Sequence, residues 1–186
     1  MSDTNGISLG TVARQLTRKL TVATLCEANI LKQLPKKKAD ARDFFYTRQW
    51  SHHINLLPSD MRSDDQRDRS TPLQQQPLLL ARRFVAKESL ETLEIMGMYP
   101  VFDPMRPEGC CVWEMRTKDT RTFGWFKCKN AFVAVCAGPI WLFKDENNKS
   151  IDATYAKFKK QVTDFISSSV LKSEVSQEND TNLLVD

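Results

Sequence analysis

Cations at strand ends and along one strand face give this chain its clearest potential for chemistry. Arg116 ends a strand-like run of alternating polarity over residues 110–116. Arg121 and Lys127 lie six residues apart in the next run, residues 120–128, so the two-residue period of a strand puts them on one face. A guanidinium group grips two phosphate oxygens and stays charged. The pattern therefore indicates contacts with a phosphate backbone.

Two aromatic residues share the face of Arg121 and Lys127. Phe123 and Trp125 lie between these cations with the same parity along the strand. Flat rings beside cations suit single-stranded RNA, because bases stack on the rings while the cations contact phosphates. The alternative is that both rings belong to the core and the cations lie at its edges.

The elements that position these residues are predicted to form an antiparallel meander. A continuously apolar run, residues 131–137, is typical of a strand covered on both faces. The turns around Lys118 and Lys129 are only a few residues long, which favours hairpins. Apolar residues at steps of three and four then predict a helix over residues 151–166 with one buried stripe, ending the domain.

The first half of the chain has weaker signals. Residues 1–19 look like a leader, and residues 20–25 are β-like, although residues 9–34 can equally be read as one helix that ends at Pro35. Lys36, Lys37 and Lys38 are expected to open a second helical segment that reaches Phe45. A polar stretch of mixed charge near residues 58–76 predicts a surface insertion.

Further helices are expected over residues 78–85 and 90–96, and a disordered acidic tail over residues 171–186. The domain proper is then residues 20–170. The fold class predicted is α+β: a small, mainly antiparallel sheet with N-terminal helices on one face and a C-terminal helix.

Composition sets limits on function. The chain has 186 residues, a net charge of +4 and 41% hydrophobic residues, which suits one domain and permits an anionic partner. It has no apolar run of about 18 residues, so no membrane span is expected. The polar first ten residues lack a signal core, and the five cysteines form no CxxC motif, which together favour a cytoplasmic protein with reduced thiols.

Neither a metal nor a cofactor is expected. His52 and His53 form the only histidine pair, but adjacent histidines point apart, and no Asp, Glu or Cys lies at ligand spacing. Surface or partly packed histidines are the simpler interpretation. No glycine-rich phosphate loop or Ser-His-Asp order is present.

Several short motifs resemble the RelE/ParE superfamily of bacterial toxins, in particular its HigB-like, phage-derived branch. Residues 93–97 with a proline-bearing connector, and Val112-Trp113-Glu114-Met115-Arg116, resemble that branch's helix, linker and aliphatic-Trp/Tyr-Glu-Leu-Arg strand. Phe143-Lys144 and the helix after it resemble its closing segment, and residues 28–36 its first helical hairpin. The chain departs from the family at Asp145, where a second lysine is common, and in its long stretch 46–88.

The resemblance implies a RelE-like fold and a metal-independent endoribonuclease that cuts messenger RNA, usually on the ribosome, and is neutralised by a protein antitoxin. Arg116, Arg121 and Lys144 become the candidate catalytic residues, Lys144 as a phosphate contact or an acid. Candidate RNA-binding residues are Lys36, Lys37, Lys38, Lys118, Trp125 and Lys127. The alternatives are a non-catalytic or ParE-like binding protein that acts on a partner such as a DNA topoisomerase, and a phage or mobile-element accessory protein without toxicity.

Overall fold

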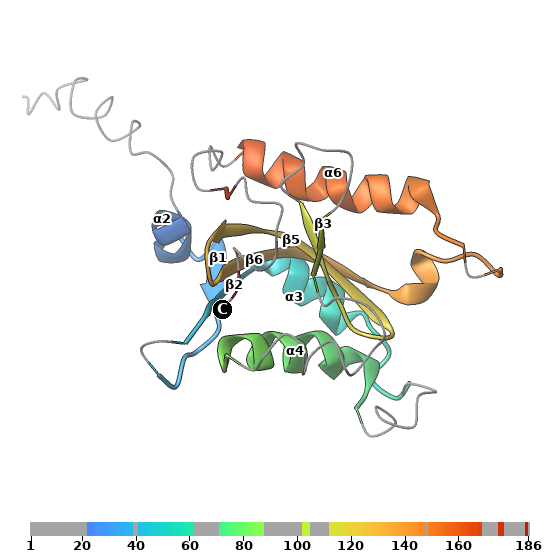
Figure 1. Ribbon diagram of the computed structural model, residues 1–186, viewed down its shortest axis with the longest axis horizontal. Helices are drawn as coiled ribbons and strands as arrows, with labels where there is room; N and C mark the ends of the chain where they lie inside the picture. The colour runs from blue at the N-terminus through green and yellow to red at the C-terminus, as the bar shows by residue number, and fades with distance from the viewer. Residues whose placement is uncertain are drawn as a thin grey trace, which may run out of the picture.

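The protein is an α+β domain with helices on both faces of one sheet (Figure 1). The computed structural model describes residues 22–38, 41–61, 71–87, 102–104, 112–147, 149–168, 175–176 and 185. Within these residues the predicted fold class and the C-terminal helix are confirmed. The predicted leader, residues 1–19, and the predicted helix over residues 90–96 lie outside the described residues.

The sheet of the described residues has six strands in the order β1-β2-β6-β5-β4-β3. Every neighbouring pair is antiparallel except β2 and β6, which are parallel. The predicted meander is confirmed as β4, β5 and β6, since hairpins join these three strands. The strands are β1 (Leu31–Gln33), β2 (Asp43–Thr47), β3 (Phe102–Pro104), β4 (Trp113–Arg116), β5 (Thr120–Cys128) and β6 (Ala131–Pro139).

One face of the sheet is covered by helices from the first half of the chain. These are α3 (Arg48–Asn55) and α4 (Gln76–Val85), the second preceded by the short helix η1 (Leu73–Gln75). Trp50 of α3 and Phe84 of α4 are buried against Phe44 and Phe132 of the sheet. Because these rings meet at tilted or edge-on angles, they fill one apolar layer.

The other face is covered by α6 (Asp152–Ser168), which lies above the sheet in Figure 1. Phe158, Val162 and Ile166 are its buried residues, which confirms the predicted stripe. Before it, η2 (Ile140–Leu142) follows β6 directly. Helix α2 (Val22–Glu27) packs into this same layer through Val22 and Leu25. The sequence predicted all N-terminal helices on one face of the sheet, and this prediction is wrong for α2.

Two assignments in the first half of the chain are wrong. The run 20–25, predicted as a strand, belongs to α2 from Val22 onward. The helix ends at Glu27, and Asn29 in the turn that follows has a φ of 56°, the left-handed conformation that asparagine tolerates after a helix. Ile30 N–H donates to Leu25 C=O at 2.9 Å across it. The local sequence is short and rich in residues that suit either state, so packing of Val22 and Leu25 decides between them.

The predicted helices that end at Pro35 and start at Lys36 are strands β1 and β2 in the structure. Strand β2 pairs with β6 from Asp43↔Ala131 to Tyr46↔Ala134, and β1 pairs with β2. The pairing of β2 with β6 joins residues almost ninety positions apart in the chain, so local periodicity cannot reveal it.

Beyond the end of β2, helix α3 lies beside the edge of β6 in place of a paired strand. Thr47 caps this helix by accepting from Trp50 N–H at 3.0 Å, and its hydroxyl donates to Val135 C=O at 2.7 Å. Two residues further on β6, Ala137 N–H donates to His53 Nδ1 at 3.2 Å. Side chains of α3 therefore satisfy backbone groups that a strand would otherwise pair.

The predicted insertion and tail both contain packed residues. Leu73 is buried, and its N–H donates to Met61 C=O at 3.0 Å, which closes the connection whose residues 62–70 lie outside the described part. In the tail, Ser176 N–H donates to Phe126 C=O at 2.8 Å, and Val185 is only 4% exposed within the α3–α4 layer. At these positions the tail is in contact with the domain.

Candidate functional site

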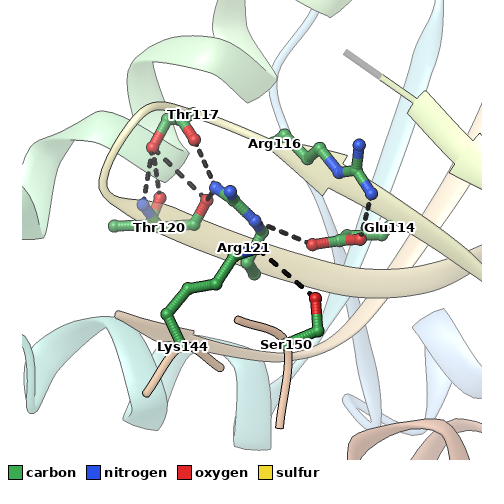
Figure 2. A network of polar contacts seen from close by, with 7 residues as sticks. All are labelled: Glu114, Arg116, Thr117, Thr120, Arg121, Lys144 and Ser150. Atoms are coloured by element: carbon green, nitrogen blue, oxygen red, sulfur yellow. Dashed lines mark hydrogen bonds and ion pairs between the residues drawn. The ribbon is translucent and has the colours of Figure 1, made fainter. Parts of the chain in front are cut away.

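A buried carboxylate joins the two candidate catalytic arginines. Glu114 Oε2 lies 2.9 Å from Arg116 Nη2, and Glu114 Oε1 lies 2.8 Å from Arg121 Nε (Figure 2). The strand register explains the cluster, because Arg116 pairs with Arg121 across β4 and β5 while Glu114 stands two residues before Arg116 on the same face. Glu114 is 2% exposed. The three side chains form one ion-pair cluster, called here the Glu114 cluster.

Arg121 is held by the turn as well as by Glu114. Its Nη1 donates to Thr117 C=O at 2.5 Å and to Thr120 C=O at 2.9 Å, as Figure 2 shows. Its side chain is 11% exposed, whereas that of Arg116 is 21% exposed. Arg116 is therefore the guanidinium group of the cluster that an incoming phosphate can reach more easily. Arg121 is placed to hold the hairpin and the carboxylate in position.

The turn that binds Arg121 is itself fixed to helix α4. Thr117 Oγ1 donates to Gln76 Oε1 at 2.9 Å, and Gln76 Nε2 donates to Asp119 Oδ2 at 2.9 Å. Gln76 is 5% exposed at the first position of α4. A polar network thus runs from the helix on one face of the sheet, through the β4–β5 turn, to the ion pair on the other face.

Tyr155 brings a hydroxyl group from α6 to the Glu114 cluster. Burial raises the pKa of Tyr155, and the charge of Glu114 raises it further, while a hydrogen bond to Arg121 and the charges of both arginines act in the opposite direction. Its ring packs on Phe143 and Phe123 at 5.1 and 6.1 Å between centroids. The phenol therefore stays protonated near neutral pH and can donate a hydrogen bond.

Lys144 lies on the segment that leads from η2 into α6. Its Nζ donates to Ser150 Oγ at 3.3 Å, and the two residues form an isolated antiparallel bridge (Figure 2). The neighbouring Phe143 is buried against α6, so Lys144 belongs to the same side of the sheet as the Glu114 cluster.

Apart from Lys118, the candidate RNA-binding residues do not form one site with Arg116. Trp125 is completely buried, and its ring centroid lies 5.9 Å from that of Phe165, so the ring offers no surface for a base. Burial therefore supports the interpretation of Phe123 and Trp125 as core residues. Lys118 is exposed in the β4–β5 turn. Lys127 lies at the far end of β5, roughly 20 Å from Arg121 at the usual rise of a strand. Lys36, Lys37 and Lys38 are exposed in the β1–β2 connection at that far end.

The histidine pair is divided between surface and interior. His52 is exposed, whereas His53 is half-buried beside Phe158 and accepts from Ala137 N–H. Burial lowers the pKa of His53, and the charge of His52 lowers it further. Among the residues that the structure describes, no group of three His, Cys, Asp or Glu side chains is placed to hold a metal ion. No helix in that part of the chain has the length and apolar character needed to span a membrane.

Sequence reasoning missed Glu114 and Tyr155 as members of the site. Glu114 was part of the strand motif but had no role, although its position two residues before Arg116 puts both on one face. Tyr155 follows the apolar period of α6, which indicated a core residue. Comparison of the chain with protein-family models, with curated proteins and with solved structures gave no match.

Proposed function

We propose that this chain is a toxin-like, metal-independent endoribonuclease that cuts messenger RNA, with a RelE-like fold of the HigB-like kind. The observation that supports the proposal best is the Glu114 cluster, in which a buried carboxylate orients two guanidinium groups beside the hydroxyl of Tyr155. Fixed cations of this kind are what a phosphoryl transition state needs, since they offset its charge without reorganising.

The reaction proposed is attack of a ribose 2′-oxygen on the adjacent phosphorus. The bond to the 5′-oxygen breaks, the 2′-hydroxyl loses its proton, and the leaving oxygen gains one. Arg116 contacts a phosphate oxygen, because it is the more accessible guanidinium group, and Arg121 acts as a positioning residue through Glu114 and the turn. Lys144 supplies a second phosphate contact or the proton for the leaving oxygen. Association with the ribosome and neutralisation by a protein antitoxin belong to the same proposal.

A second candidate function is a binding protein that acts on a protein partner such as a DNA topoisomerase. Two observations favour it. Arg121 is engaged with Glu114 and two backbone carbonyls, and Trp125 lies inside the core, so the predicted stacking face is not exposed. In this case the Glu114 cluster serves only to fix the β4–β5 hairpin.

The two candidates are separated by inducing the wild type and Arg116→Ala in bacteria and mapping RNA 5′ ends. For the nuclease, we expect the wild type to produce new cleavage sites that are lost in Arg116→Ala. The control Arg48→Ala, at an exposed arginine, is expected to keep them. Melting curves of both variants show whether folding is intact. DNA damage without RNA cleavage indicates the topoisomerase partner, and neither effect indicates a binding module.

Metal independence is tested on the purified protein with intact ribosomes supplied separately. Cleavage is expected to be the same when the protein has been treated with EDTA as when it has been kept in magnesium. Cleavage that is lost on chelation and restored by a stoichiometric divalent ion contradicts the mechanism.

A further inference from the structure

Three basic segments that are distant in the sequence meet at one end of the sheet. They are residues 36–38 and 41–42 of the β1–β2 connection, residues 82–87 at the end of α4, and residues 127–130 around the β5–β6 turn. The first and third are joined where Asp43 N–H donates to Asn130 C=O at 2.7 Å. The first and second are joined where Arg42 Nη1 donates to Phe84 C=O at 3.5 Å, with its guanidinium 5.3 Å from the centre of the Phe84 ring. We call this surface the basic end.

The described residues of the basic end carry almost entirely positive charge, while the acids Asp40 and Glu88 of the same stretches lie outside the described part of the chain. On the described part of these segments and their neighbour in β2, Asp43 is the one acid, and it lies 2.6 Å from Lys36. Arg83 and Lys127 are partly exposed, and Arg42 is buried beneath the surface. The exposed cations are Lys36, Lys37, Lys38, Arg82, Lys87 and Lys129.

The basic end also lacks an apolar centre. The exposed large hydrophobic residues of the described chain are Ile30, Leu56, Met61, Leu79, Trp141 and Leu142. None lies on the three segments, and the nearest in sequence is Leu79, one turn before Arg83 in α4. Protein interfaces usually have an apolar or aromatic centre, whereas contacts with a nucleic-acid backbone are mainly salt bridges to phosphates. The surface therefore fits a phosphate backbone better than a protein partner.

We propose that the basic end binds the phosphate backbone of structured RNA, separately from the Glu114 cluster. The two surfaces lie at opposite ends of β5, roughly 20 Å apart by the rise of a strand, so one can be removed without touching the other. Arg82, Lys87 and Lys129 enter this surface through the fold, because contacts at Arg42 and Asp43 join the β1–β2 connection to the end of α4 and to the β5–β6 turn.

The test measures binding of an RNA duplex of about 20 base pairs to the full chain over a range of salt concentrations. The variant Lys37→Gln/Lys38→Gln/Arg82→Gln/Lys87→Gln is expected to bind at least about tenfold more weakly, with a salt slope smaller by about 2 or more. A matched control, Lys157→Gln/Lys160→Gln, removes exposed charge from α6 and is expected to change affinity by less than about threefold.

The proposal is overturned by no duplex binding by the wild type, by equal loss of affinity in the control, or by undiminished binding by the fourfold variant. Equal loss in the control means that net charge alone is responsible. Two other anionic probes are tested in parallel: vesicles that contain an anionic lipid, and, separately, a polyglutamate peptide. Tighter binding of either probe than of the RNA duplex also overturns the proposal. Failure of the nuclease proposal is seen as absence of RNA cleavage by the wild type, whereas failure of this proposal is seen in duplex binding, so the two failures are distinguishable.

Discussion

Glu114 is a carboxylate almost without access to water, and two guanidinium groups offset the cost of its burial. Such an arrangement is asymmetric in energy, because removing one partner leaves a buried charge without compensation, whereas removing both does not. Arg116 and Arg121 differ in this respect. Arg121 is nearly buried and depends on Glu114, while Arg116 retains contact with solvent.

Glu114→Gln is therefore expected to lower the free energy of unfolding by roughly 3–5 kcal/mol, because it leaves Arg121 buried beside a neutral side chain. Glu114→Gln combined with Arg121→Gln should cost less than the sum of the two single changes. Arg116→Ala should cost less than Glu114→Gln, because Glu114 keeps its ion pair with Arg121. Denaturant unfolding measures all four variants. The exposed pair Lys160–Asp164 provides the control, since Lys160→Ala should change stability by about 0.5 kcal/mol or less. Additive single effects contradict the coupling.

His53 should make stability fall in acid. Its pKa is lowered from the ordinary value of 6.5, so the unfolded chain binds a proton more readily than the folded chain does. The stabilising contribution is then complete above about pH 6.5 and is lost as the pH falls through that value toward the folded pKa. Protonation also removes the acceptor for Ala137 N–H.

The measurement is the melting temperature between about pH 7.5 and pH 5. His53→Asn keeps an acceptor atom and cannot be protonated there, so its fall in melting temperature should be smaller than that of the wild type. His52→Asn, at the exposed neighbour, should retain most of the wild-type fall. If His53→Asn shows the full fall, another group is responsible.

At the scale of elements, the sequence predicted those whose signal is local. The alternation in residues 120–128 and the apolar run that follows predicted β5 and β6, and the apolar stripe predicted α6. Strand β2 was mistaken for a helix, because its partner β6 is distant in the sequence, and β1 was mistaken with it because β1 pairs with β2. The same limit applies to the site: Arg116 was found from its strand, but its ion pair with Glu114 depends on a register and a burial that no local pattern reveals.

Phe158 is the central contact between α6 and the sheet. It is 7% exposed, and its ring lies 4.8 Å from Phe143 and 5.1 Å from Phe123 between centroids. Phe158→Ala should cost roughly 3–5 kcal/mol, because it leaves a cavity between two other aromatic rings. Lys157→Ala on the exposed side of the same helix should change stability by about 0.5 kcal/mol or less. A melting temperature that Phe158→Ala leaves unchanged would contradict this packing.

For the molecule as a whole, the two functional proposals depend on opposite ends of one sheet. The Glu114 cluster lies where β4 meets β5, and the basic end lies where β1, β2, α4 and the β5–β6 turn meet. A rigid meander holds the two ends at a fixed separation, so an RNA held at the basic end can present a more distant segment to Arg116. Cleavage of a substrate with a duplex part should then be reduced more by the fourfold basic-end variant than cleavage of a short single strand.

The C-terminus takes part in the stability of the whole domain. The acidic composition of the tail predicted a disordered segment, yet Val185 is 4% exposed in the layer that also holds Trp50 and Phe84. Val185→Ala should therefore lower the free energy of unfolding by roughly 1.5–3 kcal/mol. Val185→Asp should cost more, because it buries a carboxylate among apolar residues.

Denaturant midpoints of the full chain measure both changes at Val185. Val175→Ala provides the control, since Val175 is only partly buried, in the α6 layer, and should show the smaller effect. If both Val185 variants unfold at the wild-type midpoint, the last residues are not part of the core, and the prediction of a free tail made from the sequence is the better description. If only Val185→Asp lowers the denaturant midpoint, the site is buried but tolerates the smaller apolar side chain. The packing around Val185 would then be looser than its exposed fraction of 4% implies.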